Sequence, residues 1–132
     1  MLKIYVVAAV ILTKNKQILI AKRSDSKPQG GFWEFPGGKI ERDETPTEGL
    51  FRELKEELAI SVLEMRPFIK LEHEYPERSI ILDVWIVEKF TGNARGNEGQ
   101  TIAWVSIDQL NQYQFPEANR LIVDKLQTSL PY

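Results

Sequence analysis

The sequence predicts a sandwich of the α/β or α+β class, and three observations support this prediction. First, the segment from Ile4 to Thr13 is a continuous apolar run, typical of a strand that is buried on both faces. Second, segments 66–74 and 79–90 have strand character. Third, segments 45–58 and 117–127 have the period of amphipathic helices. Strands combined with two main helices indicate helices that pack on a sheet.

The remaining elements are predicted from turn residues and short apolar stretches. They are a hairpin turn at 14–16, a strand at 17–22, a polar loop at 24–31, a turn at 75–78, a flexible loop at 92–99, a short strand at 101–106 and a helical turn at 107–110. In the last helix, Leu121, Ile122 and Leu126 are predicted to face the core.

Length and composition place limits on the class of protein. A chain of 132 residues fits one domain, 1–132, and 42% hydrophobic with 27% charged residues is ordinary for a globular protein. The net charge of −2 argues against a general nucleic-acid-binding surface. No apolar run reaches the roughly 20 residues that a membrane span needs, and no signal peptide is evident. The absence of cysteine is compatible with a reducing cytoplasm, which is the expected location. We also expect a monomer.

The most informative segment is the predicted helix that contains Arg52-Glu53-Leu54-Lys55-Glu56-Glu57. The helical wheel places an apolar stripe on one face, made of Leu50, Phe51, Leu54 and Leu58. Its carboxylates, Glu53, Glu56 and Glu57, lie beside that stripe. Like charges at such spacings cost about 0.2–0.5 kcal/mol per pair. The cluster therefore predicts a bound cation, and oxygen ligands favour Mg²⁺, with Mn²⁺ as a possible substitute.

Local signals fix the start of this helix. Thr45 is predicted as the N-cap, with Pro46 at the first helical position and Glu48 completing a capping box. A glycine turn, Pro36-Gly37-Gly38, precedes the helix and would let backbone atoms approach a metal ion or phosphate. The ordinary alternative is a solvated, Glu-rich surface helix after an unremarkable turn.

The spacing in this segment resembles the Nudix box, G-x5-E-x7-R-E-U-x-E-E-x-G-U, in which U is aliphatic. The matching residues are Gly38, Glu44, Arg52, Glu53, Leu54, Glu56, Glu57 and Ile60. Ala59 departs from the pattern, because the family has glycine there. That position near the helix end commonly takes a left-handed conformation. Alanine there would cost on the order of 1 kcal/mol without removing a ligand.

The resemblance extends over nearly the whole chain to the MutT type of Nudix enzyme. It is carried by Trp33–Glu41, Tyr75–Arg78, Asn97–Gln100 and Phe115–Asn119. The resemblance implies a mixed sheet sandwiched between helices. It also implies Mg²⁺-dependent hydrolysis of 8-oxo-dGTP to the monophosphate and pyrophosphate, a nucleotide-pool sanitising activity that keeps oxidised guanine out of DNA synthesis. Attack at the β phosphorus is expected, and the sequence leaves α attack open.

The resemblance also implies roles for individual residues. Metal ligands would be Glu56, Glu57 and the Gly37 carbonyl, with Glu53 as a ligand or the general base and Glu98 as a ligand or water activator. Arg52, next to Glu56 on the helical wheel, is expected to orient a carboxylate, and Glu44 to support the metal site or the water. The nucleotide site would include Arg23, Glu34, Phe35, Pro36, Gly37, Gly38, Arg78 and Asn119; for Phe35 a core position is an equal alternative.

Asn119 is the candidate for base recognition, although it could instead cap the last helix. Its amide offers one acceptor and one donor group. 8-Oxoguanine presents N7–H and O6 to such a pair, whereas guanine presents two acceptors. The mismatch would leave a buried polar group unpaired, at about 1–3 kcal/mol. Adenine and cytosine edges also offer a donor beside an acceptor, so this residue alone does not define the base.

Two alternative functions remain open. Val6 to Val10 and Gly31 to Phe35 also resemble the CTP and 5-methyl-dCTP diphosphatase branch of the same family. A catalytically silent Nudix domain that serves as a binding module would be expected to lose carboxylates from the box, and this chain retains Glu53, Glu56 and Glu57.

Overall fold

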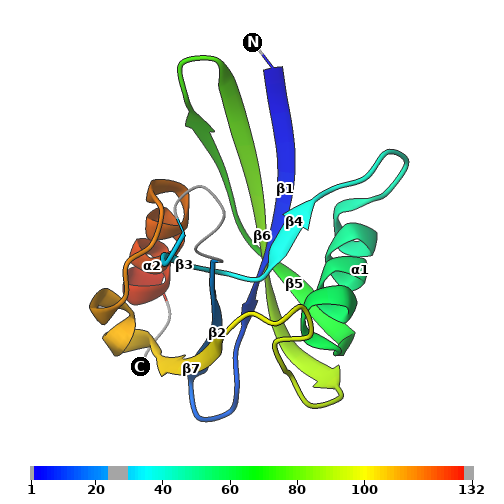
Figure 1. The fold of residues 1–132 in the computed structure, drawn as a ribbon, viewed down its shortest axis with the longest axis vertical. Coiled ribbons are helices and arrows are strands. Elements are labelled where there is room, and N and C mark those ends of the chain that lie inside the picture. Colours follow the sequence, from blue (N-terminus) through cyan, green and yellow to red (C-terminus); the bar gives the residue numbers. More distant parts are fainter. Residues whose placement is uncertain (1, 24–29, 130–132) are drawn as a thin grey trace.

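The computed structural model describes residues 2–23 and 30–129, and its elements follow the predicted order (Figure 1). They are β1 (Leu2–Ile11), β2 (Gln17–Lys22), β3 (Trp33–Glu34), β4 (Gly37–Lys39), α1 (Pro46–Leu58), β5 (Ser61–Glu74), β6 (Arg78–Thr91), β7 (Ile102–Ser106), the 3₁₀ helix η1 (Ile107–Gln112) and α2 (Glu117–Ser129). The α+β class is confirmed. Most of the loop predicted at 24–31 lies outside the described residues.

The strands form two sheets. The four-stranded sheet has the order β4-β1-β6-β5, and the three-stranded sheet has the order β3-β2-β7. In the first, β1 runs parallel to β6, whereas β4 and β5 pair antiparallel with β1 and β6. In the second sheet both pairings are antiparallel. The expected mixed sheet is therefore present, and β2, β3 and β7 form a separate sheet beside it.

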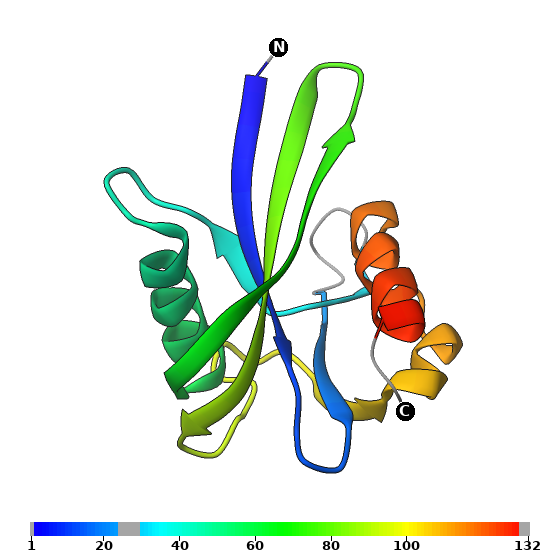
Figure 2. The same ribbon diagram turned by 180° about the vertical axis from the view of Figure 1, so that it is seen from behind.

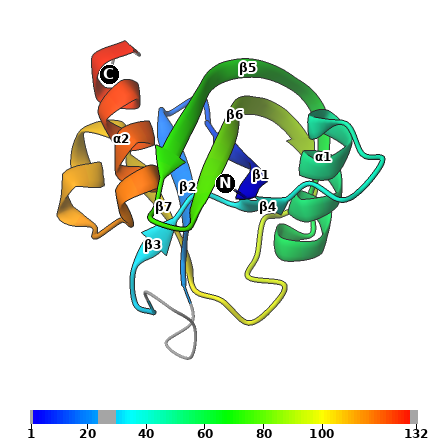
Figure 3. The same cartoon turned by 90° about the horizontal axis from the view of Figure 1, so that it is seen from above.

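Strand β1 lies between two hydrophobic clusters, which explains its continuous apolar run. Val7, Ala9 and Ile11 pack with the buried face of α1, while Ala8 and Val10 pack with the buried side chains of α2. Figure 3 shows the two helices on opposite sides of the strands. Alternate residues of β1 thus belong to the two clusters, because successive side chains of a strand point to opposite faces.

The predicted core faces of the helices are correct except at one residue in each. In α1, the leucines at 50, 54 and 58 are fully buried, but Phe51 is 38% exposed. In α2, Ile122 and Leu126 are buried as predicted, but Leu121 is 39% exposed and Val123 is buried instead. Both errors concern an apolar residue at the border of the apolar stripe. The helical wheel alone does not determine which border of the stripe the neighbouring strands cover.

The β5–β6 hairpin and the start of β1 extend beyond the helices (Figure 2). The predicted burial on both faces of β1 holds for its second half only, because Leu2 and Tyr5 are 64% and 53% exposed. The turn predicted at 75–78 is confirmed by backbone hydrogen bonds in both directions between Tyr75 and Arg78. In the described part of the chain, no helix has the length and apolar character needed to span a membrane.

Candidate active site

The start of α1 determines where its carboxylates project. The Thr45 hydroxyl accepts from the backbone N–H of Glu48 at 3.2 Å, and the Glu48 carboxylate accepts from the Thr45 N–H at 2.9 Å. This is the predicted capping box, and it satisfies two N–H groups that would otherwise lack partners. The fixed helix start and the buried leucine face together hold Glu53 and Glu57 on the side of α1 that borders β4.

Strand β4 brings glycine backbone against that side of the helix. A Cβ on Gly38 would lie 2.6 Å from the Glu53 carboxylate, and one on Gly37 would lie 2.0 Å from the Val7 carbonyl oxygen. Gly37 also has a φ of 154°, in the range that favours glycine. Both glycines therefore allow close contact with protein atoms, whereas their predicted approach to a metal ion or phosphate stays a prediction. The predicted turn is wrong, because Gly38 pairs with Val7 in a strand.

Arg52 is the centre of a hydrogen-bond network around the carboxylates. Its Nε and Nη2 donate to the two oxygens of Glu44 at 2.7 and 3.1 Å, a bidentate contact. Its Nη1 donates to Glu53 at 2.9 Å and to Glu56 at 3.4 Å, and Nη2 also donates to the Lys39 carbonyl at 3.2 Å. The Arg52 hydrogen bond lowers the pKa of Glu44, and the same bond raises the pKa of Arg52. This geometry agrees with the predicted orienting role.

Glu57 is the most strongly perturbed carboxylate. Its Oε2 atom is buried and has no hydrogen-bond partner among residues 2–23 and 30–129. Burial raises the pKa of Glu57 to about 9, with further contributions from Glu53, Glu98 and Glu34. A buried carboxylate that is surrounded by other carboxylates favours either a proton or a cation. The perturbation therefore marks Glu57 as a functional candidate.

One cavity of about 310 Å³ brings most of the predicted site residues together. Predicted residues that line it are Arg23, Glu34, Phe35, Gly37, Gly38, Glu53, Glu57, Glu98 and Asn119. The box carboxylates and the residues assigned to the nucleotide thus share one space. The volume lies at the lower end of the roughly 300–1,000 Å³ typical of small-molecule sites.

Side-chain contacts organise the part of the cavity assigned to the nucleotide. Arg23 Nη1 lies 3.1 Å from Glu34 Oε2 in an ion pair. The Phe35 backbone N–H donates to Asn119 Oδ1 at 3.1 Å, and the Phe35 ring stacks on Phe115 with a centroid separation of 5.6 Å. Asn119 lies within α2 rather than before it, so the alternative of an N-cap is wrong. Phe35 is both a core residue, 4% exposed, and part of the cavity wall.

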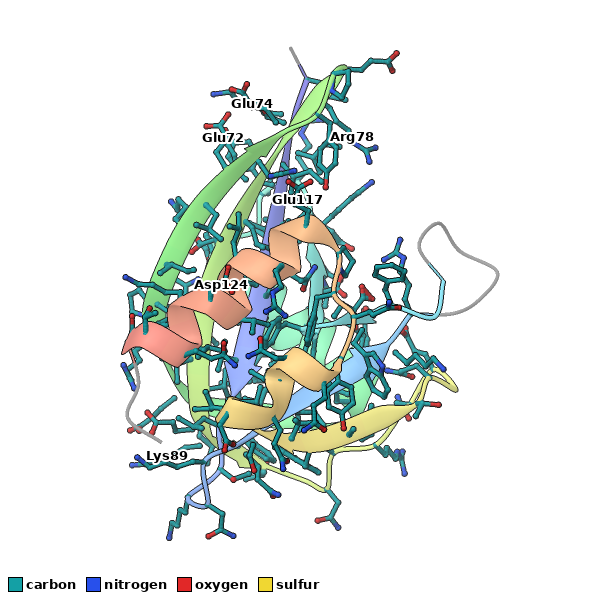
Figure 4. All side chains as sticks on the ribbon, turned by 90° about the vertical axis from the view of Figure 1, so that its left-hand side faces the viewer. Glu72, Glu74, Arg78, Lys89, Glu117 and Asp124 are labelled. Atoms are coloured by element: carbon teal, nitrogen blue, oxygen red, sulfur yellow. The ribbon has the colours of Figure 1, made fainter. Side chains whose placement is uncertain are left out.

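Some predicted site residues do not line this cavity. They are Pro36, Glu44, Arg52, Glu56 and Arg78. Glu44 and Arg52 act behind the cavity through the network described above. The Glu56 side chain is 55% exposed and turned toward Arg52. Arg78 lies at the end of the β5–β6 hairpin, on the opposite side of the strands from Glu72 and Glu74 in Figure 4. Its guanidinium is 5.5 Å from the centroid of the Tyr75 ring.

The sequence did not identify several cavity residues. Lys39 lines the cavity beside Gly38, and the rest of the wall comes from Val6, Val7, Ala8 and Leu82. The available signal was the position of Lys39 directly after the glycine pair, because a cation beside a phosphate site can neutralise phosphate charge. The apolar residues gave no signal, since their role follows only from the pairing of β1 with β4 and β6.

The donor set fits a divalent cation. The partnerless Glu57 oxygen and the surrounding carboxylates supply the oxygen ligands that Mg²⁺ and Mn²⁺ prefer. Within residues 2–23 and 30–129, no group of three or more His, Cys, Asp and Glu side chains is already arranged to hold a metal ion. Because the Glu56 side chain does not line the cavity, metal binding there would have to reorient at least this side chain.

The fold and the cavity define a class of protein before any comparison is made. Oriented carboxylates on one helix, glycine backbone in contact with one of them and oxygen donors for a divalent cation form the kind of site that metal-assisted hydrolases use.

Comparison with known proteins identifies the family. The NUDIX domain matches residues 7–125. An 8-oxo-dGTP diphosphatase of Escherichia coli (strain K12) is 40% identical over 126 residues, which cover 96% of this chain and 98% of that protein. A CTP pyrophosphohydrolase of the same strain is 36% identical over 118 residues, covering 89% and 87%. A structure from a study of MutT from Aliivibrio salmonicida and Vibrio cholerae superposes with a TM-score of 0.85 at 40% identity, covering 97% and 99%.

The chain therefore belongs to the Nudix family. It is a hydrolase of phosphoric anhydrides, and such enzymes generally use a divalent metal ion.

Proposed function

We propose that this enzyme hydrolyses 8-oxo-dGTP to 8-oxo-dGMP and pyrophosphate with Mg²⁺. The observation that carries the proposal is a single cavity that contains both the box carboxylates Glu53 and Glu57 and the candidate base-reading residue Asn119. The 40% identity to an 8-oxo-dGTP diphosphatase over nearly the full length of both chains supports the same substrate. The enzyme would then act on the cytoplasmic nucleotide pool as a monomer consisting of one domain, 1–132.

In this proposal the carboxylates and the Gly37 carbonyl hold the metal. The carboxylate ligands are Glu56 and Glu57, with Glu53 as a further ligand or the general base and Glu98 as a further ligand or the water activator. When bound, the cation neutralises phosphate charge and makes water more acidic. The chain itself supplies the orientation: Arg52 fixes Glu53, the candidate general base, with a 2.9 Å hydrogen bond. Gly38 leaves the space that this carboxylate occupies.

The proposed reaction is attack of water on the β phosphorus. The new bond joins the water oxygen to that phosphorus, and the bond from the β phosphorus to the oxygen bridging it to the α phosphorus breaks. The bridging oxygen stays with 8-oxo-dGMP, and the proton lost by water passes to the base. Hydrolysis in ¹⁸O-water should therefore label pyrophosphate, whereas attack at the α phosphorus would label the monophosphate.

Base selection is assigned to Asn119. Because its Oδ1 already accepts from the Phe35 N–H, the orientation of the amide is fixed. The second lone pair of Oδ1 can accept N7–H of 8-oxoguanine, and the Nδ2 group can donate to O6. Guanine has a lone pair at N7, so Oδ1 would face another acceptor. Such a mismatch costs about 1–3 kcal/mol.

A second candidate is a cytosine nucleotide. The observation that favours it is the 36% identity to a CTP pyrophosphohydrolase over most of both chains. A cytosine edge also presents a donor beside an acceptor, so the fixed Asn119 amide admits it.

The deciding experiment compares kcat/KM with Mg²⁺ for 8-oxo-dGTP, dGTP, dCTP, 5-methyl-dCTP and CTP. We expect 8-oxo-dGTP to exceed dGTP by about a hundredfold or more, about 2.7 kcal/mol. A preference for a cytosine nucleotide would retain the chemistry and reject the base assignment. Glu53→Gln tests the chemistry itself: if turnover in Mg²⁺ changed little, the proposed carboxylate mechanism would be wrong.

A further inference from the structure

The loop that carries Glu98 is hydrogen-bonded to the C-terminal end of α1. The last four carbonyls of a helix lack partners within the helix, and here each one accepts a hydrogen bond. The cap residue Ala59 donates its N–H to Lys55 O at 3.1 Å. The loop supplies the others: Asn97 Nδ2 to Glu56 O at 2.9 Å, Asn97 N and Gln100 Nε2 to Glu57 O at 2.9 Å each, and Arg95 N to Leu58 O at 3.1 Å.

The Gln100 side chain also makes a hydrogen bond to the backbone of Glu98. Its Oε1 accepts the backbone N–H of Glu98 at 2.9 Å, while its Nε2 donates to the carbonyl of Glu57 at 2.9 Å. One side-chain amide therefore joins the backbones of two residues whose carboxylates line the cavity. Gln100 itself is partly buried and does not line the cavity.

We infer that Gln100 is a positioning residue, which sets the place of the Glu98 carboxylate relative to Glu57. This inference rests on the role proposed above for Glu98. The bridge requires a donor and an acceptor on one side chain of this length, which is what a glutamine amide provides. Misplacing a catalytic group by about 1 Å can cost on the order of a hundredfold in rate. Loss of the bridge should therefore lower turnover without changing the groups that contact the nucleotide.

The test uses Gln100→Met, which keeps the length of the side chain and removes both hydrogen bonds. Asn97→Ala is the matched control. It removes the hydrogen bond from the Asn97 amide to the adjacent carbonyl, Glu56 O, and the one from Arg95 Nε to Asn97 Oδ1, and it leaves the Glu98 N–H bond intact. If the loop amides only cap the helix, both variants should lower the melting temperature and leave kcat close to that of the wild type. Positioning predicts that kcat falls about tenfold or more in Gln100→Met alone, with KM within about twofold.

A double-mutant cycle with Glu98→Ala separates positioning from a general structural effect. In the Glu98→Ala background, Gln100→Met should cause no further loss of kcat. Equal losses in both backgrounds would overturn the inference, as would wild-type kcat in Gln100→Met together with a large loss in Glu98→Ala. Wild-type kcat in Glu98→Ala would instead overturn the role proposed for Glu98. If Gln100→Met does not fold, Gln100→Glu serves the same cycle, because it keeps the acceptor for the Glu98 N–H and loses the donor to Glu57 O.

Discussion

At the scale of single residues, Arg52 shows how one side chain can control a site that it does not line. Its planar guanidinium contacts Glu44 through two nitrogens and Glu53 through a third. Arg52→Lys keeps the positive charge but cannot form this fork. We expect kcat to fall about 10- to 100-fold with a small change in KM, measured by steady-state kinetics with 8-oxo-dGTP. Arg42→Lys, at an exposed arginine in the preceding loop, should behave as the wild type; equal activity of both variants would refute the orienting role.

Asn119 gives a residue-scale prediction about specificity. Asn119→Ala removes both amide groups from the cavity, so the contacts proposed for N7–H and O6 of 8-oxoguanine are lost together. We expect kcat/KM for 8-oxo-dGTP to fall by about 5- to 150-fold, corresponding to about 1–3 kcal/mol, and kcat/KM for dGTP to fall much less. Asn111→Ala is the control, because Asn111 contacts Arg120 away from the cavity. Equal losses for both nucleotides would show that Asn119 does not distinguish the bases.

At the scale of elements, the end of α1 carries a measurable strain. Ala59 has φ 59° and ψ 35°, the left-handed conformation predicted for this position, where alanine costs on the order of 1 kcal/mol. Ala59→Gly should therefore raise the melting temperature by about 3–5 °C, as measured by circular dichroism. Lys125→Gly, at an exposed position in the interior of α2, is the control and should lower it, because glycine weakens a helix interior. A decrease in both variants would mean that the left-handed cap stores no strain.

The elements that the sequence predicted well are those with local signals. The bounds of β2 and α1 match almost to the residue, because a turn and a capping box mark their starts. Strands β3 and β4 were missed, since they have two and three residues and exist only through pairing with β2 and β1. The site divides in the same way. The box spacing predicted Glu53 and Glu57 in one cavity, whereas the Phe35–Asn119 hydrogen bond joins residues 84 positions apart and has no local signal.

At the scale of the whole molecule, the cavity depends on the fold as a unit. Its wall takes residues from β1, β3, β4, β6, α1 and α2 and from the loop that follows β6. The buried carboxyl of Glu57 therefore experiences its perturbed environment only in the folded protein. Its free energy of ionisation is thus linked to the free energy of unfolding, and ligands that bind the ionised cavity should stabilise the whole chain.

The sign of this linkage is opposite to the usual behaviour of carboxylates. Glu57 has a pKa of about 9 in the fold against an ordinary value of 4.5, so the folded protein binds more protons between these limits. The contribution of Glu57 to the stability of the metal-free protein is then fully present below about pH 4.5 and is lost as the pH rises through about 9. Glu44 has a lowered pKa, so its contribution is lost as the pH falls below its ordinary value of 4.5 and does not affect this window.

Melting temperatures in a metal chelator should therefore decrease from about pH 5 to pH 9, and Glu57→Gln should reduce this slope, because an amide has no proton to lose. Glu64→Gln is the control, since Glu64 is an exposed carboxylate that pairs with Lys89, and it should keep the wild-type slope.

Adding Mg²⁺ should raise the melting temperature of the wild type most at high pH, where the cation replaces the lost proton on Glu57, and should stabilise Glu57→Gln less. An unchanged slope in Glu57→Gln would show that this carboxyl does not carry the linkage. If the melting temperature depended only weakly on pH and Mg²⁺ stabilised both the wild type and Glu57→Gln strongly, the cation would be bound by carboxylates other than Glu57.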